Sequence, residues 1–140
     1  MKPRITLLTL GVDDLERSLK FYHEGLGFPT KGIVGKEFDH GAVVFFDLLG
    51  GLKLALYPRE DIAYTTHVPE TPQSSTEFTI GHNVNTKEEV DAVMMLAEKA
   101  GAEIPDPAHD TFWGGYEGIF KDPDGHLWEV AWNPAWVVEE

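Results

Sequence analysis

The chain of 140 residues is long enough for one domain that buries roughly two-thirds of its unfolded surface. The absence of cysteine excludes disulfide bonds and thiolate metal sites. The formal net charge of -13 argues against a nucleic-acid partner, because phosphate binding requires clustered Lys and Arg. The apolar run in the opening MKPRITLLTLGVDD is too short for a signal peptide or a membrane span, so we expect a cytoplasmic protein with no membrane contact.

The first half of the chain predicts a strand, a helix and a β-hairpin. Residues 4–12 are rich in β-forming side chains and end at Asp13 and Asp14. Apolar residues then recur near helical spacing until glycines at 25 and 27 stop the helix. The segments GAVVFFDLLGG and LKLALYP predict two short strands joined across Gly50 and Gly51. Residues 59–76 are rich in Pro, Thr and Ser without a sustained period, which predicts a connector.

The second half begins the same pattern again. TEFTIGHNV predicts a strand, and the segment after it predicts an amphipathic helix with a capping box from Thr86 to Glu89 and an end at Gly101. IPDPAHDTFWGGY predicts a loop. FKDPDGHLWEVAWNP then predicts a hairpin with a Pro-Asp-Gly turn, whose returning strand carries one carboxylate, Glu129, among apolar residues.

Counting along the two halves indicates an internal repeat. Ala55 follows Phe46 by nine residues, and Glu129 follows Phe120 by nine residues. We therefore predict an α+β fold with two βαβββ repeats, which form a paired, cupped mixed β-sheet with helices on the outside. The whole chain, 1–140, is predicted as a single domain, with repeat one at about 3–58, the connector at about 59–76 and repeat two at about 77–134. Ala55 and Glu129 then occupy equivalent positions on the concave face.

Three motifs carry a resemblance to a known family: GVDDLERSLKFYHEGLGF after the first strand, TFWGGYEGIF, and DPDGHLWEVAWNP near the end. With the repeat spacing, they resemble the vicinal oxygen chelate superfamily, which includes glyoxalase I, extradiol dioxygenases and the fosfomycin- and bleomycin-resistance proteins. The resemblance implies the fold far more specifically than it implies an activity.

The resemblance also implies where a metal would bind. Catalytic members hold one divalent metal through up to four inward-facing side chains, one on the first and one on the last strand of each repeat. The matching positions here are Leu7, Ala55, Thr79 and Glu129, and Glu129 is the one residue among them that could bind a metal well. Because zinc sites use at least three protein ligands, the sequence predicts no cofactor and no family-type metal site. A divalent metal completed by substrate oxygens or other histidines is the alternative.

The predicted cavity contains aromatic and apolar side chains. Trp113 and Tyr116 flank a glycine pair, and flat amphipathic rings suit an aromatic ligand. Trp128, Trp132 and Trp136 are instead predicted to pack in the core or at a dimer interface. Glu129 is then a lone carboxylate, suited to proton transfer or to pairing with a cation. The residues predicted to contact a ligand besides Glu129 are Leu7, Thr9, Phe46, Ala55, Tyr57, Thr79, Trp113 and Tyr116.

Two functions follow from this site. The first is a glyoxalase-related protein that binds a small, aromatic molecule and uses Glu129 in lyase, isomerase or dioxygenase-related chemistry, as a base or as a metal ligand. The second is a metal-free protein of the bleomycin-resistance type that sequesters a small molecule. The resemblance further implies a homodimer, for which the tail WNPAWVVEE offers apolar surface.

Overall fold

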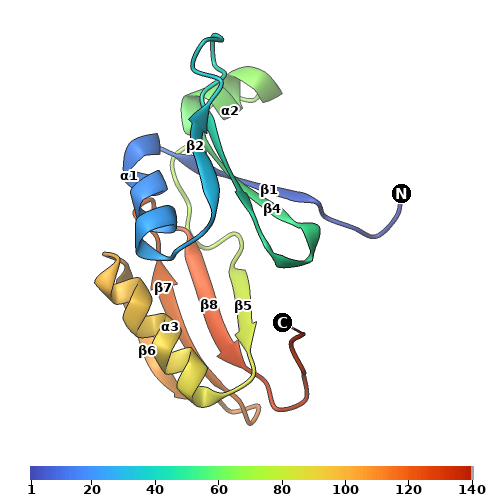
Figure 1. The fold of residues 1–140 in the computed structure, drawn as a ribbon, viewed down its shortest axis with the longest axis vertical. Helices are drawn as coiled ribbons and strands as arrows, with labels where there is room; N and C mark the ends of the chain where they lie inside the picture. The colour runs from blue at the N-terminus through green and yellow to red at the C-terminus, as the bar shows by residue number, and fades with distance from the viewer. Residues whose placement is uncertain (140) are drawn as a thin grey trace. The chain divides into compact units, whose positions relative to one another are not determined.

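The computed structural model describes residues 1–139 and divides the chain into two compact units, Met1–Pro72 and the segment from Gln73 onward. Each unit contains one four-stranded mixed sheet with helices, so each is a βαβββ module as predicted (Figure 1). None of the helices in residues 1–139 is long and apolar enough to cross a membrane.

Unit 1 has the strand order β1-β4-β3-β2, in which β1 and β4 are parallel and the other neighbours are antiparallel. Asp14 caps its first helix by accepting a hydrogen bond from the Arg17 backbone N–H at 3.1 Å. The elements in chain order are β1 (Leu7–Val12), α1 (Leu15–Leu19), the π-helical η1 (Lys20–Gly25), β2 (Thr30–Val34), β3 (Val43–Asp47), the short 3-10 turn η2 (Leu49–Gly51), β4 (Lys53–Pro58) and α2 (Arg59–Thr66).

Helix α2 corrects one expectation, because it occupies the first eight residues of the predicted connector. Its sequence lacks an apolar stripe, so periodicity gives no signal for it. Tertiary contacts hold it instead. Buried Asp61 lies 2.5 Å from the Nδ1 atom of His40, whose ring stacks on Tyr64. Glu60 and Asp61 in the first turn also interact favourably with the positive end of the helix dipole.

Unit 2 has the equivalent strand order β5-β8-β7-β6, with β5 and β8 parallel. The predicted capping box of its helix is confirmed, since Thr86 accepts from Glu89 N and the Glu89 carboxylate accepts from Thr86 N. Gly101 follows the helix end with a φ of 105°, which favours glycine. The elements are β5 (Ile80–Val84), α3 (Lys87–Lys99), β6 (Glu103–Asp110), β7 (Tyr116–Lys121) and β8 (Leu127–Trp132).

Strand β6 corrects a second expectation, because most of it lies in the predicted loop. The two prolines at 105 and 107 argue against a central strand, but β6 is the edge of its sheet, where proline is tolerated. Its pairing with β7 shifts register twice between Glu103 and His109, as expected for an irregular edge.

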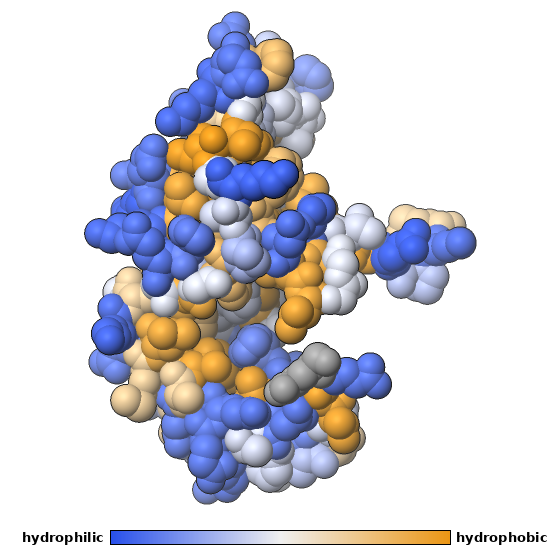
Figure 2. Space-filling view, viewed as in Figure 1, coloured by the Kyte–Doolittle hydropathy of each residue, from blue (hydrophilic) through white to orange (hydrophobic). Residues whose placement is uncertain are grey.

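Strand alternation gives each sheet one face packed against a helix and one open face. In unit 1 most residues of β1, β3 and β4 that face α1 are buried, and η1 adds Phe21 and Tyr22 to this core. In unit 2, Val90, Met94 and Ala97 of α3 pack on the corresponding face. We call the opposite face of each sheet its open face. Apolar side chains also reach the surface of both units, as the orange areas of Figure 2 show.

Candidate functional site

The open face of the unit 2 sheet presents Glu129 near its centre. On β8, Glu129 lies directly opposite Gly81 of β5 and Ile119 of β7. A Cβ atom added at position 81 would have Asn83 Nδ2, at 3.9 Å, as its nearest contact beyond the adjacent residues, so the glycine leaves space beside the carboxylate. The local sequence explains the position, because the turn at residues 122–126 fixes the hairpin register and alternation then points Glu129 away from α3.

Two polar side chains contact Glu129. The Thr79 hydroxyl donates to Glu129 Oε2 at 3.4 Å. Glu117 of β7 stands two residues from the position opposite Glu129, on the same face, and the two carboxyl groups share a hydrogen bond. Burial raises the pKa of Glu117, and the hydrogen bond and negative charge of Glu129 raise it further, whereas the charge of His109 opposes them.

A cavity of about 230 Å³ opens beside this carboxylate pair. Trp113 forms one wall, with its ring directly against Gly115, where any added side chain would collide with it. The lining residues are Gly81, Asn83, Trp113, Glu129, Ala131, Asn133 and Trp136. The cavity thus combines a carboxylate, two amides and two indole rings, a set that can bind a flat molecule with one polar head.

Trp136 reaches this cavity because the C-terminal segment is fastened to the start of α3. Asn85 Nδ2 donates to the Val138 carbonyl at 2.9 Å, and Val138 N donates to Asn85 Oδ1 at 2.8 Å. Trp136 lines the cavity and is 60% exposed, so it does not pack in the core of this chain, and its packing at a dimer interface stays a prediction. Trp128, by contrast, is buried and stacks on Phe120, as predicted.

Comparison with known proteins identifies the family of the chain. The family model of the Glyoxalase/Bleomycin resistance protein/Dioxygenase superfamily matches residues 4–130. The chain belongs to this superfamily.

Several solved structures of the glyoxalase superfamily resemble the chain. A glyoxalase-related enzyme from Fulvimarina pelagi is 32% identical with a TM-score of 0.82, over 98% of this chain and 93% of that one. A glyoxalase/bleomycin resistance protein/dioxygenase from Nocardioides is 26% identical with a TM-score of 0.74, over 99% and 91% of the two chains. Lactoylglutathione lyase from Agrobacterium tumefaciens, at 22% identity, shares the fold with a TM-score of 0.69, over 97% and 98%. A comparison with curated proteins found no match.

The donor atoms present do not fit the metal of catalytic glyoxalase-superfamily members. Of the four positions that the resemblance assigns, Leu7 and Ala55 offer no donor and Thr79 offers a neutral hydroxyl that contacts Glu129. Within residues 1–139, no group of three or more His, Asp or Glu side chains is placed to hold a metal ion. Glu129 alone among these positions offers a good metal donor, and a zinc site needs at least three protein ligands.

Four other predicted ligand contacts lie on the open face of unit 1. Leu7, Thr9, Ala55 and Tyr57 share that face by register, with Thr9 directly opposite Ala55. Tyr57 is tied to the β2–β3 loop, because its hydroxyl donates to the His40 carbonyl. Thr79 and Trp113 lie at the unit 2 site, at Glu129 and at the cavity wall respectively. Ligand contact by these residues stays a prediction.

Two predicted contacts are placed wrongly. Phe46 is fully buried under the helices of unit 1, because its neighbour Phe45 is the residue that pairs with Ala55 on the open face. The nine-residue spacing aligns the two units correctly, because Phe46 and Phe120 each follow the residue that pairs with Ala55 or Glu129. That offset of one residue places Phe46 on the opposite face of the strand. Tyr116 pairs with Trp132 on the α3 side of unit 2, where its hydroxyl donates to Asp91 at 2.7 Å.

Glu117 is the residue that sequence reasoning missed. The signal was present, because a hairpin turn at residues 122–126 pairs 119 with 129 and so sets 117 on the same face as Glu129. Nothing in the sequence shows how far Glu117 is desolvated, and this is what separates it from an ordinary surface glutamate.

Proposed function

We propose that the chain binds a small organic molecule in the unit 2 cavity, with the Glu129 carboxylate accepting a proton or a positively charged group from it. One observation carries the proposal: Glu129, held by Thr79 and Glu117, lines a cavity walled by Trp113 and Trp136. A carboxylate beside indole rings favours a cationic head on an aromatic body.

The size of the cavity limits the ligand. Drug-sized ligands occupy pockets of about 300–1,000 Å³. At about 230 Å³ the unit 2 cavity is smaller. At roughly 30 Å³ per non-hydrogen atom, the share of one water molecule in the liquid, this volume leaves room for about eight atoms. A single substituted ring fits this volume. We propose that binding needs no metal, because the donor set described above is insufficient.

The contact between Glu117 and Glu129 favours chemistry as a second candidate function. A carboxylic acid next to a carboxylate supplies a proton donor and a proton acceptor within one site, which suits lyase or isomerase reactions that begin with proton abstraction. The same cavity without turnover corresponds to a sequestering protein of the bleomycin-resistance type. Both functions require ligand contact with Glu129, so binding is tested first.

The binding test compares three single-ring probes, benzylamine, benzyl alcohol and benzoate, by quenching of tryptophan fluorescence. Benzylamine is expected to bind most tightly, and Glu129→Gln is expected to weaken it roughly tenfold, since a hydrogen bond to a charged group is lost. Trp113→Ala should weaken all three probes. Glu98→Gln, which removes an exposed carboxylate of α3, is the matched control. Equal affinity for the three probes, unchanged in Glu129→Gln, would contradict the proposal.

Chemistry and metal content are tested separately. Phenylacetone, with an acidic CH₂ group, is incubated with the protein in D₂O, and proton abstraction by Glu129 predicts faster deuterium exchange than in buffer and loss of this gain in Glu129→Gln. Exchange at the buffer rate would leave sequestration as the function. Elemental mass spectrometry of protein purified without an affinity tag checks the metal-free proposal, which a stoichiometric metal absent from Glu129→Gln would overturn.

A further inference from the structure

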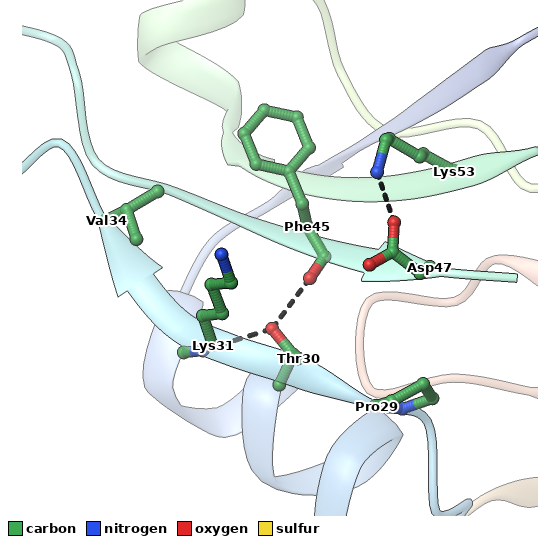
Figure 3. A pocket seen from close by; sticks show the side chains of 8 residues that line it. Pro29, Thr30, Lys31, Val34, Phe45, Asp47 and Lys53 are labelled. Atoms are coloured by element: carbon green, nitrogen blue, oxygen red, sulfur yellow. Dashed lines mark hydrogen bonds and ion pairs between the residues drawn. The ribbon is translucent and has the colours of Figure 1, made fainter.

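We propose that the open face of unit 1 is a second binding site, which takes a small carboxylate with a flat apolar body. The site is a cavity of about 500 Å³ lined by Pro29 and by residues of β2, β3 and β4. It contains none of the residues assigned to the unit 2 cavity, and it does not depend on the function proposed there. Its lining residues are Pro29, Thr30, Lys31, Gly32, Val34, Phe45, Asp47 and Lys53 (Figure 3).

An irregularity in β2 builds the edge of this site. The pairing of β2 with β3 shifts register between Thr30 and Ile33, and Gly32 has a φ of 84°. The Thr30 hydroxyl fixes the irregularity, because it donates to the Phe45 carbonyl at 2.6 Å and accepts from Gly32 N at 3.1 Å. Bulges of this kind redirect side chains. Lys31 accordingly rises from β2 toward Phe45 and Val34 (Figure 3).

The walls of the cavity are apolar and accessible. The Phe45 side chain is 41% exposed and Val34 is 42% exposed, although both lie within strands. The cavity volume falls inside the range of about 300–1,000 Å³ that suits small organic ligands. A flat body of two fused rings would cover the Phe45 ring and remove its exposed apolar surface from water.

The charges of the site favour an anion. Lys53 donates to Asp47, and the Lys53 hydrogen bond and charge, with a further contribution from the charge of Lys31, lower the pKa of Asp47 and keep it ionised. Two ammonium groups thus face one carboxylate, which leaves a single excess positive charge. Lys31 has no ion-pair partner among residues 1–139. One excess charge matches a carboxylate better than a doubly charged phosphate.

A purely structural role for Lys31 makes different predictions. β2 is the edge strand of its sheet, and lysines on edge strands prevent pairing with other chains. That role requires neither a cavity nor an accessible phenyl ring, and it predicts no preference for an anionic ligand. The two roles therefore differ in ligand selectivity.

The test titrates the full-length, ¹⁵N-labelled protein with 2-naphthoate and follows the backbone amides by NMR. The amides of Gly32, Phe45 and Lys53 are expected to shift, and Lys31→Met to weaken binding about fivefold, the effect of losing one partly exposed ion pair. The neutral analogue 2-naphthylmethanol should bind wild type as weakly as 2-naphthoate binds Lys31→Met. Lys36→Met, which removes an exposed lysine paired with Glu16 in the same unit, is the control and should bind like wild type.

Three outcomes would overturn the proposal. These are equal affinity in wild type and Lys31→Met, equal affinity for the naphthoate and the alcohol, and shifts confined to Gly81, Asn83 and Ala131. The last outcome would place the ligand in the unit 2 cavity, and its loss in Glu129→Gln would confirm that placement. Should Lys31→Met fail to fold, Lys31→Gln supplies the same loss of charge with a polar side chain.

Discussion

Glu117 and Glu129 lie on neighbouring strands of one open face, and burial together with the proximity of Glu129 raises the pKa of Glu117. Because burial and Glu129 raise the pKa of Glu117, the native state retains a proton at pH values where the unfolded chain has lost it. Stability is therefore expected to fall as pH rises from the ordinary glutamate pKa through the raised pKa of Glu117. Glu117→Gln removes this proton uptake.

The prediction is that Glu117→Gln flattens the decline in stability with rising pH and raises the free energy of unfolding near neutrality by up to about 1 kcal/mol, because the pair is partly solvated. Urea unfolding across a pH series measures it. Asp106 and His109 of β6, Lys121 of β7 and Glu129 of β8 also face this side and are present in both wild type and Glu117→Gln. Glu98→Gln, which removes an exposed carboxylate of α3, is the control for the loss of one negative charge. Parallel pH profiles of wild type and Glu117→Gln would contradict the prediction.

Phe45 and Phe46 are adjacent residues with opposite environments. Phe46 is fully buried against Tyr22 and Phe28, whereas the side chain of Phe45 is 41% exposed. Phe46→Ala is expected to reduce the free energy of unfolding by about 3–5 kcal/mol, and Phe45→Ala by less than about 1 kcal/mol. Urea unfolding at a fixed pH measures both. A larger loss for Phe45→Ala would mean that β3 has the opposite register.

At the scale of the element, α3 shows how local sequence fixes a boundary. Its capping box satisfies donors at the helix start that have no partner within the helix, through Thr86 and Glu89. Thr86→Ala is expected to cost about 1 kcal/mol of stability. Thermal unfolding measures the loss, with Thr76→Ala, at an exposed threonine outside any element, as the control. Equal losses for the two variants would argue that the cap contributes nothing.

Elements with a strong local signal were predictable, whereas those held by tertiary contacts were not. The α3 cap, the Gly50–Gly51 connection and the final hairpin each follow from a few neighbouring residues. Helix α2 depends on the contact between Asp61 and His40, 21 residues apart, and β6 depends on its position at a sheet edge. Local sequence patterns show neither the contact between these two distant residues nor the place of a strand in its sheet.

At the scale of the whole molecule, the repeat predicts the topology of both units but not the chemistry of the site. Equivalent strands carry Ala55 in one unit and Glu129 in the other. The repeat therefore predicts where these two side chains lie, but the two side chains differ in chemistry. The wall formed by Trp136 depends on hydrogen bonds between Asn85 and Val138, 53 residues apart. Sequence periodicity could locate the carboxylate but could not supply this wall.

The net charge of -13 leads to a prediction for the molecule as a whole. The excess negative charges repel one another in the folded protein, and salt screens this repulsion. Raising NaCl from about 20 mM to about 500 mM near pH 7.5 is expected to stabilise the protein by about 1 kcal/mol, or roughly 3–5 °C in melting temperature. Chloride is chosen because sulfate also strengthens apolar burial.

The control for this prediction is the same NaCl addition at a pH near the isoelectric point. Near the isoelectric point of about 4.7 the net charge vanishes, so the same addition of NaCl should change the melting temperature far less. Salt also screens attractive pairs such as Lys87 with Asp110, an effect of opposite sign. A melting temperature that falls with NaCl near neutral pH would show that these attractive pairs outweigh the repulsion among the excess carboxylates. Scanning calorimetry at both pH values distinguishes the two results.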